Sequence, residues 1–241
     1  NTESGNNPGG GYQANTTAGF SIVDYTGTGA SGTMAHGLGK VPTLIMIKKR
    51  TDDTESWRVY HQFGYKGDSY GQQQSGGRLD TNNAFDHGAN SYWDNTNFTT
   101  SVFTIKDNST VNDDGDTYIA YCFAEIQGYS KFGYYMGNAN VDGPFIYLGF
   151  KPKYFLLKCV DATQNWYVFD TARDTHNPSN SAIKASGDSA QETGYAMDFV
   201  SNGFKIRHDD GAWNGSGKDF VYIAFAEHPF VSSEGVPVTA R

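Results

Sequence analysis

The sequence lacks most of the features that mark helical and membrane-spanning proteins. Charged residues make up only 18% of the 241 residues, against about 25% in an average soluble domain. The Ala-, Leu-, Glu- and Lys-rich composition of helical bundles is also missing. No apolar run approaches the roughly 18 residues that a membrane-spanning helix needs. We therefore expect neither a helical bundle nor membrane insertion.

Cysteine is scarce too, with only two residues in the chain. Two cysteines are too few for a secreted scaffold held together by several disulfides. Cys122 lies within an apolar run and Cys159 follows one. We expect both to be free, buried core residues on strands, and a disulfide between them is the alternative.

Positive charge is in short supply, because the formal net charge is −8 and the sequence pI is about 5.1. Non-specific nucleic-acid binding needs a basic footprint, and anionic membrane surfaces attract basic segments. The charge therefore argues against both partners and fits a neutral or cationic one. The first residues, 1–11, are polar and rich in glycine, without the apolar stretch of a signal peptide.

What is abundant is glycine, with 29 residues, and aromatic side chains, at 15% of the chain. Val, Ile, Thr and aromatic residues alternate with Gly, Asn and Asp, which is the pattern of strands joined by turns. It predicts about twelve strands and an all-β fold. The segment 171–184 is ambiguous, and we interpret it as a loop rather than a helix.

The chain repeats itself, with blocks that recur in the same order about 110 residues later and, near the end, about 102 residues later. Such recurrence indicates a duplicated architecture. The shrinking offset places extra residues in the first half, between 64 and 98. The matching blocks are 39–42 with 149–152, 44–48 with 154–158, 57–60 with 166–169, and 112–125 with 214–227.

We therefore predict two tandem, antiparallel β-sandwich or jelly-roll halves, similar to lectins. The halves are either packed about a pseudo-two-fold axis or fused into one larger sandwich. The expected organisation is a flexible N-terminal arm or linker, a first repeat that contains the inserted loop 64–98, a second repeat and a C-terminal tail. The corresponding ranges are 1–19, 20–129, 130–230 and 231–241.

Tryptophan positions separate shared architecture from candidate function. Trp57 and Trp166 occupy matching places, which favours core packing over stacking on sugar rings. Trp93 lies in the insertion, and Trp213 stands where the first half has Val111. Both are flanked by Asp and Asn, a pattern that carbohydrate and protein contacts use. An aromatic residue packed onto the sandwich edge is the competing interpretation.

The candidate ligand-binding residues are those unmatched loop aromatics and their polar neighbours. Long loops in compact domains are often functional, so the insertion is the leading candidate for a recognition surface. A packing arm that reaches a neighbouring subunit is the alternative. The predicted set is Tyr70, Tyr92, Trp93, Asp94, Asp209, Asp210 and Trp213.

Catalytic and metal-binding motifs are not apparent. The acidic run 112–116 invites a calcium site, but the EF-hand spacing fails and the matching run in the second half lacks the carboxylates. We favour an Asn/Gly turn, so no cofactor is expected and calcium is the open alternative. Neither a Gly-x-Ser-x-Gly elbow nor a His-Glu-x-x-His motif occurs, and the six histidines are scattered. Glu125 and Glu227 are matched, which favours structural carboxylates over a glycosidase pair.

Several blocks together resemble a family of glycine-rich all-β domains found in virion proteins of tailed bacteriophages, particularly marine and cyanobacterial phages. The resemblance covers about residues 20–241 and assigns no catalytic residue. The blocks that carry it are 20–29, 36–42, 112–125 and 129–133, together with the endings 226–230 and 237–241.

The resemblance implies a virion location and a non-enzymatic surface module, such as a tail-fibre, tail-tip or decoration domain. Its partners would be other virion proteins and a host surface glycan or protein, and analogy with phage fibres implies a homo-oligomer, a trimer. A purely structural capsid or tail component that holds neighbouring subunits together is the first alternative. A polysaccharide-degrading enzyme is the second.

Overall fold

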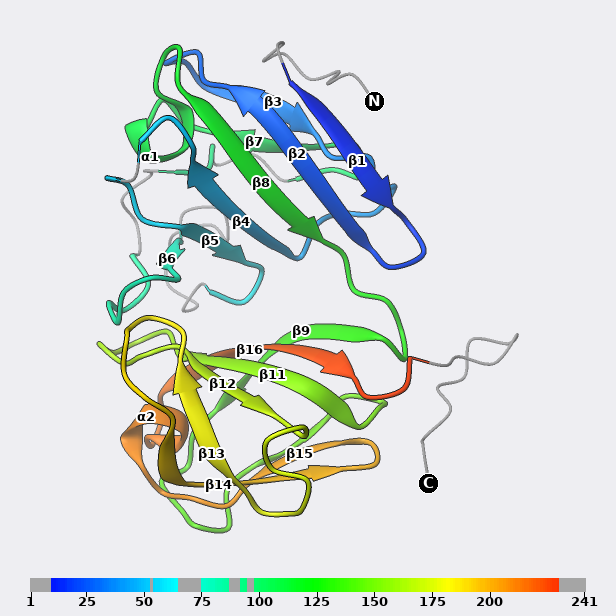
Figure 1. Cartoon of the computed structure of the whole chain (residues 1–241), viewed down its shortest axis with the longest axis vertical. Helices are drawn as coiled ribbons and strands as arrows, with labels where there is room; N and C mark the ends of the chain where they lie inside the picture. Colours follow the sequence, from blue (N-terminus) through cyan, green and yellow to red (C-terminus); the bar gives the residue numbers. More distant parts are fainter. Residues whose placement is uncertain (1–9, 53, 65–74, 87–91, 95–97, 230–241) are drawn as a thin grey trace. The chain divides into compact units, whose positions relative to one another are not determined.

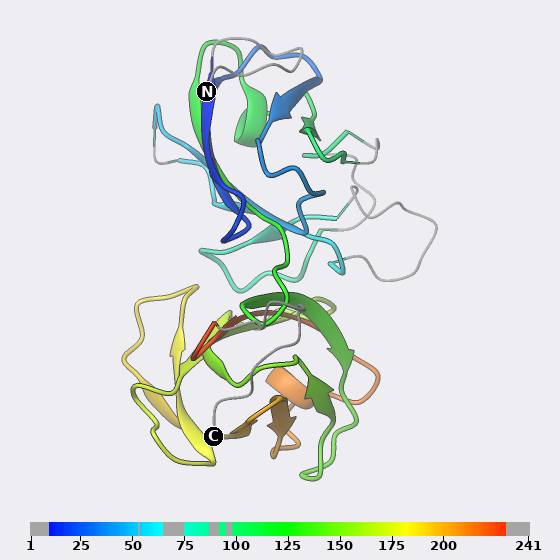
Figure 2. The same ribbon diagram turned by 90° about the vertical axis from the view of Figure 1, so that its right-hand side faces the viewer.

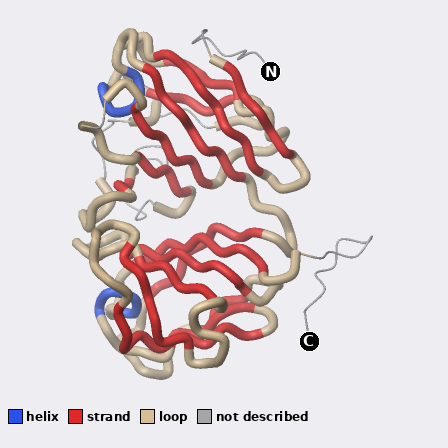
Figure 3. Tube along the Cα trace, viewed as in Figure 1, coloured by secondary structure: helices blue, strands red, loops and turns tan. Residues whose placement is uncertain are grey.

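The computed structural model describes residues 10–52, 54–64, 75–86, 92–94 and 98–229. These residues form an all-β protein of sixteen strands and two single-turn helices (Figure 1, Figure 3). All strand pairs are antiparallel. In the described part of the chain, no helix is long and apolar enough to cross a membrane. The prediction of an all-β fold is confirmed.

The chain divides into two compact units. Unit 1 comprises residues 1–80 and 85–125, and unit 2 comprises residues 81–84 and 126–241. Each unit has its own apolar core. The short segment 81–84 belongs to unit 2 although it lies within the insertion of the first half.

Unit 1 consists of a six-stranded sheet in the order β1-β2-β8-β4-β5-β6 and a two-stranded sheet of β3 and β7. The residues of β2, β4 and β8 alternate between core and outer face, as expected of half-buried strands. The elements are β1 (Gly11–Asn15), β2 (Phe20–Thr26), β3 (Gly32–Ala35), β4 (Leu44–Lys49), β5 (Arg58–His61), β6 (Gly77–Arg78), β7 (Val102–Ile105), α1 (Ser109–Asn112) and β8 (Thr117–Phe123).

Unit 2 is built on one eight-stranded sheet in the order β10-β15-β14-β13-β12-β11-β16-β9. The sheet is nearly closed (Figure 2). Lys131 Nζ on β9 donates to the Tyr147 carbonyl on β10 at 3.0 Å. Its elements are β9 (Ser130–Met136), β10 (Phe145–Tyr147), β11 (Pro152–Cys159), β12 (Tyr167–Asp170), β13 (Ser179–Lys184), β14 (Glu192–Val200), β15 (Gly203–Ile206), α2 (Gly211–Asn214) and β16 (Asp219–Ala226).

The strand orders of the two units correspond. The run β2-β8-β4-β5-β6 has the same connectivity as β9-β16-β11-β12-β13, and the pair β3-β7 corresponds to β10-β15. The helices α1 and α2 precede the matching strands β8 and β16. The described residues of unit 1 contain no strand that corresponds to β14.

Matching hydrogen bonds hold the matching loops. The Tyr25 hydroxyl donates to the Val111 carbonyl at 2.7 Å, and the Tyr135 hydroxyl donates to the Trp213 carbonyl at 2.6 Å. The last residue of each helix is a fully buried asparagine. Its side-chain oxygen accepts from a backbone N–H of the loop after β2 in unit 1 and after β9 in unit 2: Asn112 from Thr28 and Asn214 from Asn138, both at 2.9 Å.

Three local expectations need correction. Residues 11–15 are strand β1, paired with β2, rather than part of a flexible arm, because a turn at Asn15 folds the chain back onto β2. The segment 171–184 is not all loop, since residues 179–184 form β13. The loops before β8 and β16 each hold one helical turn, capped by Asn108 and Asp210.

The expectation for the cysteines is confirmed. Cys122 on β8 and Cys159 on β11 are free and buried.

Candidate functional site

A group of partly exposed aromatic and aliphatic side chains covers the outer face of the six-stranded sheet in unit 1. We call it the outer aromatic face. The ring centroids of Trp57 and Tyr121 are 5.9 Å apart at an interplanar angle of 23°, and those of Phe20 and Tyr121 are 6.3 Å apart at 7°. Its members are Phe20, Ile22, Met46, Trp57, Tyr121 and Phe123.

Strand alternation and register bring these residues together. On β8, Tyr118, Ala120 and Cys122 point into the core of unit 1, so the residues between them point outward. Tyr121 pairs with Ile22 on β2 and with Met46 on β4, and Phe123 pairs with Phe20. The outer aromatic face therefore lies across three neighbouring strands, β2, β8 and β4 (Figure 1).

Trp57 lies just before β5 and is held by its backbone. Its N–H donates to Asp80 Oδ2 at 3.3 Å, and its carbonyl accepts from Leu79 N–H at 3.2 Å. The matching Trp166 is 0% exposed, whereas Trp57 is half-buried and lies outside the core of unit 1. The prediction of core packing is thus confirmed for Trp166 but is wrong for Trp57.

Charged groups border the outer aromatic face on one side. Asp24 on β2 and Lys48 on β4 both pair with Ile119, the outward-facing residue next to Tyr121 on β8. The Lys48 ammonium donates to the Glu55 carbonyl, and Asp24 is exposed. A flat aromatic surface with a neighbouring carboxylate and ammonium group offers both the stacking and the hydrogen bonding that sugar ligands use.

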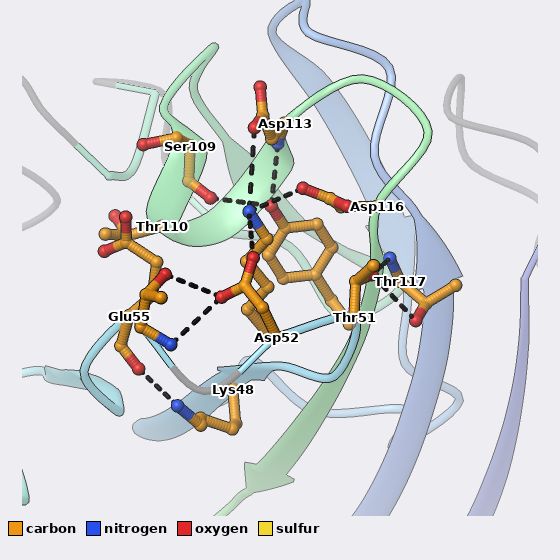
Figure 4. Close-up of polar contacts among 12 residues, drawn as sticks. Lys48, Thr51, Asp52, Glu55, Ser109, Thr110, Asp113, Asp116 and Thr117 are labelled. Atoms are coloured by element: carbon orange, nitrogen blue, oxygen red, sulfur yellow. Dashed lines mark hydrogen bonds and ion pairs between the residues drawn. The ribbon is translucent and has the colours of Figure 1, made fainter.

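The end of β4 carries a separate polar cluster around Lys49, whose side chain is 7% exposed. Figure 4 shows the residues around it, which come from the loop after β4, from α1, from the loop between α1 and β8, and from the start of β8. Lys49 Nζ lies 2.5 Å from Asp116 Oδ2, 3.2 Å from Asp52 Oδ2 and 3.6 Å from Asp113 Oδ2. An ammonium group therefore occupies the centre of this acidic cluster.

These contacts shift the pKa values of Lys49 and Asp52 in favour of their charged forms. The hydrogen bond with Asp116 is the main cause that raises the pKa of Lys49. Hydrogen bonds from Thr54, and then from Lys49, lower the pKa of Asp52 to about 2. The calcium alternative for residues 112–116 gains no support, because among the described residues no three His, Cys, Asp or Glu side chains are placed to hold a metal ion.

A second buried cluster contains Tyr92, one of the predicted ligand-binding residues. Asp86 Oδ2 accepts from the Tyr92 hydroxyl and from Arg78, both at 2.8 Å, and lies 3.5 Å from Arg58. The Arg58 guanidinium stacks 4.1 Å from the centre of the Tyr92 ring. Burial lowers the pKa of Arg58 and raises that of Tyr92. Tyr92 is 8% exposed, so its ring packs inside unit 1.

The tryptophans expected to be exposed are buried. Trp93 is 0% exposed in the core of unit 1, and its indole N–H donates to the Ser75 carbonyl at 3.1 Å. Trp213 is 5% exposed and packs edge-on to Tyr195 at 4.3 Å and to Tyr167 at 5.0 Å. Unmatched position in the repeat suggested a ligand contact, but each indole instead fills its own unit's core.

The remaining predicted site residues are dispersed. Asp94 lies 3.6 Å from Lys106, and Asp210 caps α2 by accepting from Ala212 N–H at 2.7 Å. Asp209 is exposed and lies 3.6 Å from His208. Tyr70 and most of the insertion lie outside the described residues. The structure therefore does not bring the predicted residues together as one site.

One of the two matched glutamates, Glu227, is paired with lysines. Glu227 lies 2.9 Å from Lys151 and 3.9 Å from Lys153. The hydrogen bond from Lys151 is the main cause that lowers the pKa of Glu227. An ionised, lysine-bound carboxylate fits a structural role at the strand end better than that of a general acid, which needs a raised pKa.

The sequence did not point to the outer aromatic face, because ligand-binding residues were sought among loop positions that have no counterpart in the other repeat. Most members of the face lie on strands that occur in both repeats. A signal was present in the alternation of β8, where an outward row of Ile119, Tyr121 and Phe123 interleaves with the core row. Two apolar rows on one strand indicate either burial on both faces or an exposed apolar face. Periodicity could not distinguish these possibilities.

Comparison with known proteins found no match among curated proteins and none among solved structures. A family profile matches residues 5–229, from the segment before β1 to just beyond the end of β16. The match therefore includes both units and β1. The chain belongs to the family described as "Domain of unknown function (DUF7483)".

Proposed function

We propose that this protein is a non-enzymatic binding module that recognises a glycan through the outer aromatic face of unit 1. The observation that carries the proposal is the stack of Trp57, Tyr121 and Phe20, partly exposed across neighbouring strands. Apolar faces of sugar rings stack on such surfaces, and Asp24 and Lys48 would bond the hydroxyl groups. Of the insertion residues predicted for this role, Tyr92 and Trp93 are buried and Asp94 lies beside Lys106.

The sequence resemblance to tailed-phage virion proteins supports a location on the virion and a host surface glycan as the target. In that setting, other virion proteins are the remaining partners. We further infer that the two units are tandem copies of one jelly-roll-like sandwich. The corresponding strand orders and the paired Asn112 and Asn214 contacts support this inference.

The test is a glycan array followed by titration of the best ligand, read by tryptophan fluorescence. All four tryptophans lie in the described residues, and Trp57 is the one that is not buried. Binding should therefore change the emission of Trp57. Trp57→Ala and Tyr121→Ala should each weaken binding by about tenfold or more, since one stacked ring contributes about 1–3 kcal/mol.

Tyr134→Ala is the matched control, because Tyr134 is an exposed tyrosine on the other unit. The Tyr134→Ala variant should bind the glycan with the same affinity as the unchanged protein. Binding that survives Trp57→Ala and Tyr121→Ala would contradict the proposed site. A failure of the folded protein to bind any glycan would contradict the proposed function.

Two alternatives give different results in related assays. A component that only holds subunits together would bind no glycan, and Trp57→Ala would impair its association with neighbouring virion proteins. A polysaccharide-degrading enzyme would release reducing ends from host polysaccharide. The half-buried apolar face fits the first alternative better than the second, because it offers apolar contact area to a neighbouring subunit.

A further inference from the structure

Three rings of the outer aromatic face lie in a row across the sheet of unit 1. Phe20 is on β2, Tyr121 is on β8 and Trp57 lies just before β5, and the strand order β2-β8-β4-β5 places Tyr121 between the other two. The ring centroids are 6.3 Å apart for Phe20 and Tyr121 and 5.9 Å apart for Tyr121 and Trp57. The row therefore has a middle ring, Tyr121, and two end rings.

The three rings also have similar orientations, because the interplanar angles are 7° and 23°. Atoms in van der Waals contact are about 3.5–4.0 Å apart. Nearly parallel rings with centroids 5.9 and 6.3 Å apart are therefore displaced sideways from each other rather than stacked squarely. Each of the three side chains is partly exposed, so the rings offer a ligand three neighbouring aromatic contacts.

The matching positions of unit 2 carry a different set of residues. They are no more than 4% exposed, and only one of them is aromatic: Ser130, Ile223 and Trp166. The described residues of the chain therefore contain the row once, which predicts one binding site per chain. Unit 2 also supplies a matched substitution for the middle ring, because Ile223 on β16 takes the place that Tyr121 has on β8.

A row of similarly oriented rings suits a chain of sugars better than a single sugar. A hexose ring is close in size to a phenyl ring, so consecutive units of an extended glycan can stack on consecutive rings of the row. Such stacking needs sugar rings whose faces stay parallel from one unit to the next. Extended, ribbon-like glycans meet this condition, whereas helically coiled glycans turn each ring away from the last.

The charges beside the row favour an uncharged glycan. Asp24 and Lys48 carry opposite charges and both pair with Ile119, on the same side of the row. The Lys48 ammonium is already bonded to the Glu55 carbonyl. The net charge of the chain is −8, which repels polyanions. Sugar hydroxyl groups both donate and accept hydrogen bonds, so they can bond either border group without carrying charge.

We propose that the row of Phe20, Tyr121 and Trp57 binds an internal stretch of an extended, uncharged polysaccharide, with three consecutive sugar units on the three rings. This inference rests on the proposed function, because it specifies which glycan the outer aromatic face recognises. Tyr121 contacts the middle unit, and Phe20 and Trp57 contact the two flanking units. A single terminal sugar would engage only one ring of the row.

The test is calorimetric titration of the full chain with β-1,4-linked glucose oligomers, from the monosaccharide to the hexasaccharide. The affinity should rise by about tenfold for each added unit up to the trisaccharide and then level off, because each of the three rings stacks on one unit. One oligomer should bind per chain. Coiled α-1,4-linked glucose oligomers and negatively charged galacturonic acid oligomers of equal length should bind about tenfold more weakly or less.

Two variants separate the end of the row from its middle. Phe20→Ala should lower the affinity for the trisaccharide by about tenfold but leave that for the disaccharide unchanged, because two units still fit on Tyr121 and Trp57. Tyr121→Ile installs the residue of unit 2, interrupts the row and should weaken binding of both oligomers by about tenfold or more. Tyr134→Ala is again the control, and the amide spectrum of each variant verifies that it is folded.

The outcomes distinguish this inference from the proposed function. Equal affinity for the monosaccharide and the trisaccharide would overturn the inference, and so would tighter binding of the coiled or the charged oligomers. A trisaccharide affinity that Phe20→Ala leaves unchanged would overturn it as well. In each of these cases glycan binding through the outer aromatic face would stand. The absence of binding to any glycan would overturn both.

Discussion

Buried polar side chains organise the loops of this protein more than its exposed ones do. Asn112 and Asn214 are both 0% exposed. The Asn112 amide donates to the Ala30 carbonyl at 2.6 Å, and the Asn214 amide donates to the Asn140 carbonyl at 2.8 Å. A buried amide costs free energy unless it is hydrogen-bonded, and here the neighbouring loop supplies the partners. The asparagines therefore connect α1 to the loop after β2 and α2 to the loop after β9.

At the same scale, Lys49 makes a testable contribution to stability. Lys49→Ala would leave Asp52, Asp113 and Asp116 close together without their cation. We expect the free energy of unfolding at neutral pH to fall by about 1–3 kcal/mol, because a nearly buried ion partner is lost. Urea denaturation followed by circular dichroism would measure the loss.

Acid should diminish the effect of Lys49→Ala. The pKa of Asp52 is lowered to about 2 in the folded chain, so its contribution is complete above the ordinary aspartate pKa and is lost as the pH falls through about 2. The difference between Lys49→Ala and the unchanged protein should therefore shrink between pH 4 and pH 2. A difference that stays constant down to pH 2 would contradict this account. Lys40→Ala, at an exposed position in the same unit, is the control.

Among the elements, β1 is one that the sequence patterns did not predict. Its residues are glycine-rich and polar, which favours a linker, and its burial is modest. It is held by its antiparallel pairing with β2, and its Tyr12 ring also lies close to the Gly37 backbone, which is distant in sequence. Gly37 has a φ of +66°, a left-handed conformation that suits glycine, and a side chain there would also collide with Tyr12.

A pair of glycines separates these two effects. Gly39 has a similar φ of +67°, but a Cβ added there would meet only open space, so Gly39→Ala tests backbone conformation alone. We expect Gly39→Ala to lower the free energy of unfolding by about 1 kcal/mol, and Gly37→Ala to lower it by about 1–2 kcal/mol more than Gly39→Ala does. Hydrogen exchange of β1 amides should accelerate in Gly37→Ala only. Equal losses in both variants would show that the Tyr12 contact contributes little.

For the molecule as a whole, each unit contains a separate aromatic core. Phe103 is 0% exposed in the core of unit 1, and Phe155 is 0% exposed in the core of unit 2. Truncating either to alanine should destabilise its own unit by about 3–5 kcal/mol, because a large buried ring leaves a cavity. The amide exchange of each variant would show which residues respond.

We expect Phe103→Ala to speed exchange in β2, β4 and β8, and Phe155→Ala to speed exchange in β11, β12 and β16. The two variants act as controls for each other, since they remove the same ring from different cores. Equal acceleration in both units by either variant would contradict separate cores and indicate one cooperative molecule.

The sequence alone determined the all-β class, most strand positions and the repeated order of elements. These follow from local signals, since alternation sets strand faces and Gly/Asn turns set strand ends. Cys122 and Trp166 were placed correctly in buried positions for the same reason. The repeat also identified the positions that differ between halves, including Trp93 and Trp213.

Only the tertiary structure decided what those positions do. Burial depends on partners far away in sequence, so Trp93 and Trp213 became core residues, whereas the matched Trp57 is left partly exposed. The contacts of Lys49 with Asp113 and Asp116 and the close approach of Tyr12 to Gly37 also join residues that are far apart in the sequence. Composition and spacing describe neighbours along the chain, but a binding surface is defined by which side chains remain uncovered once the sheets have packed.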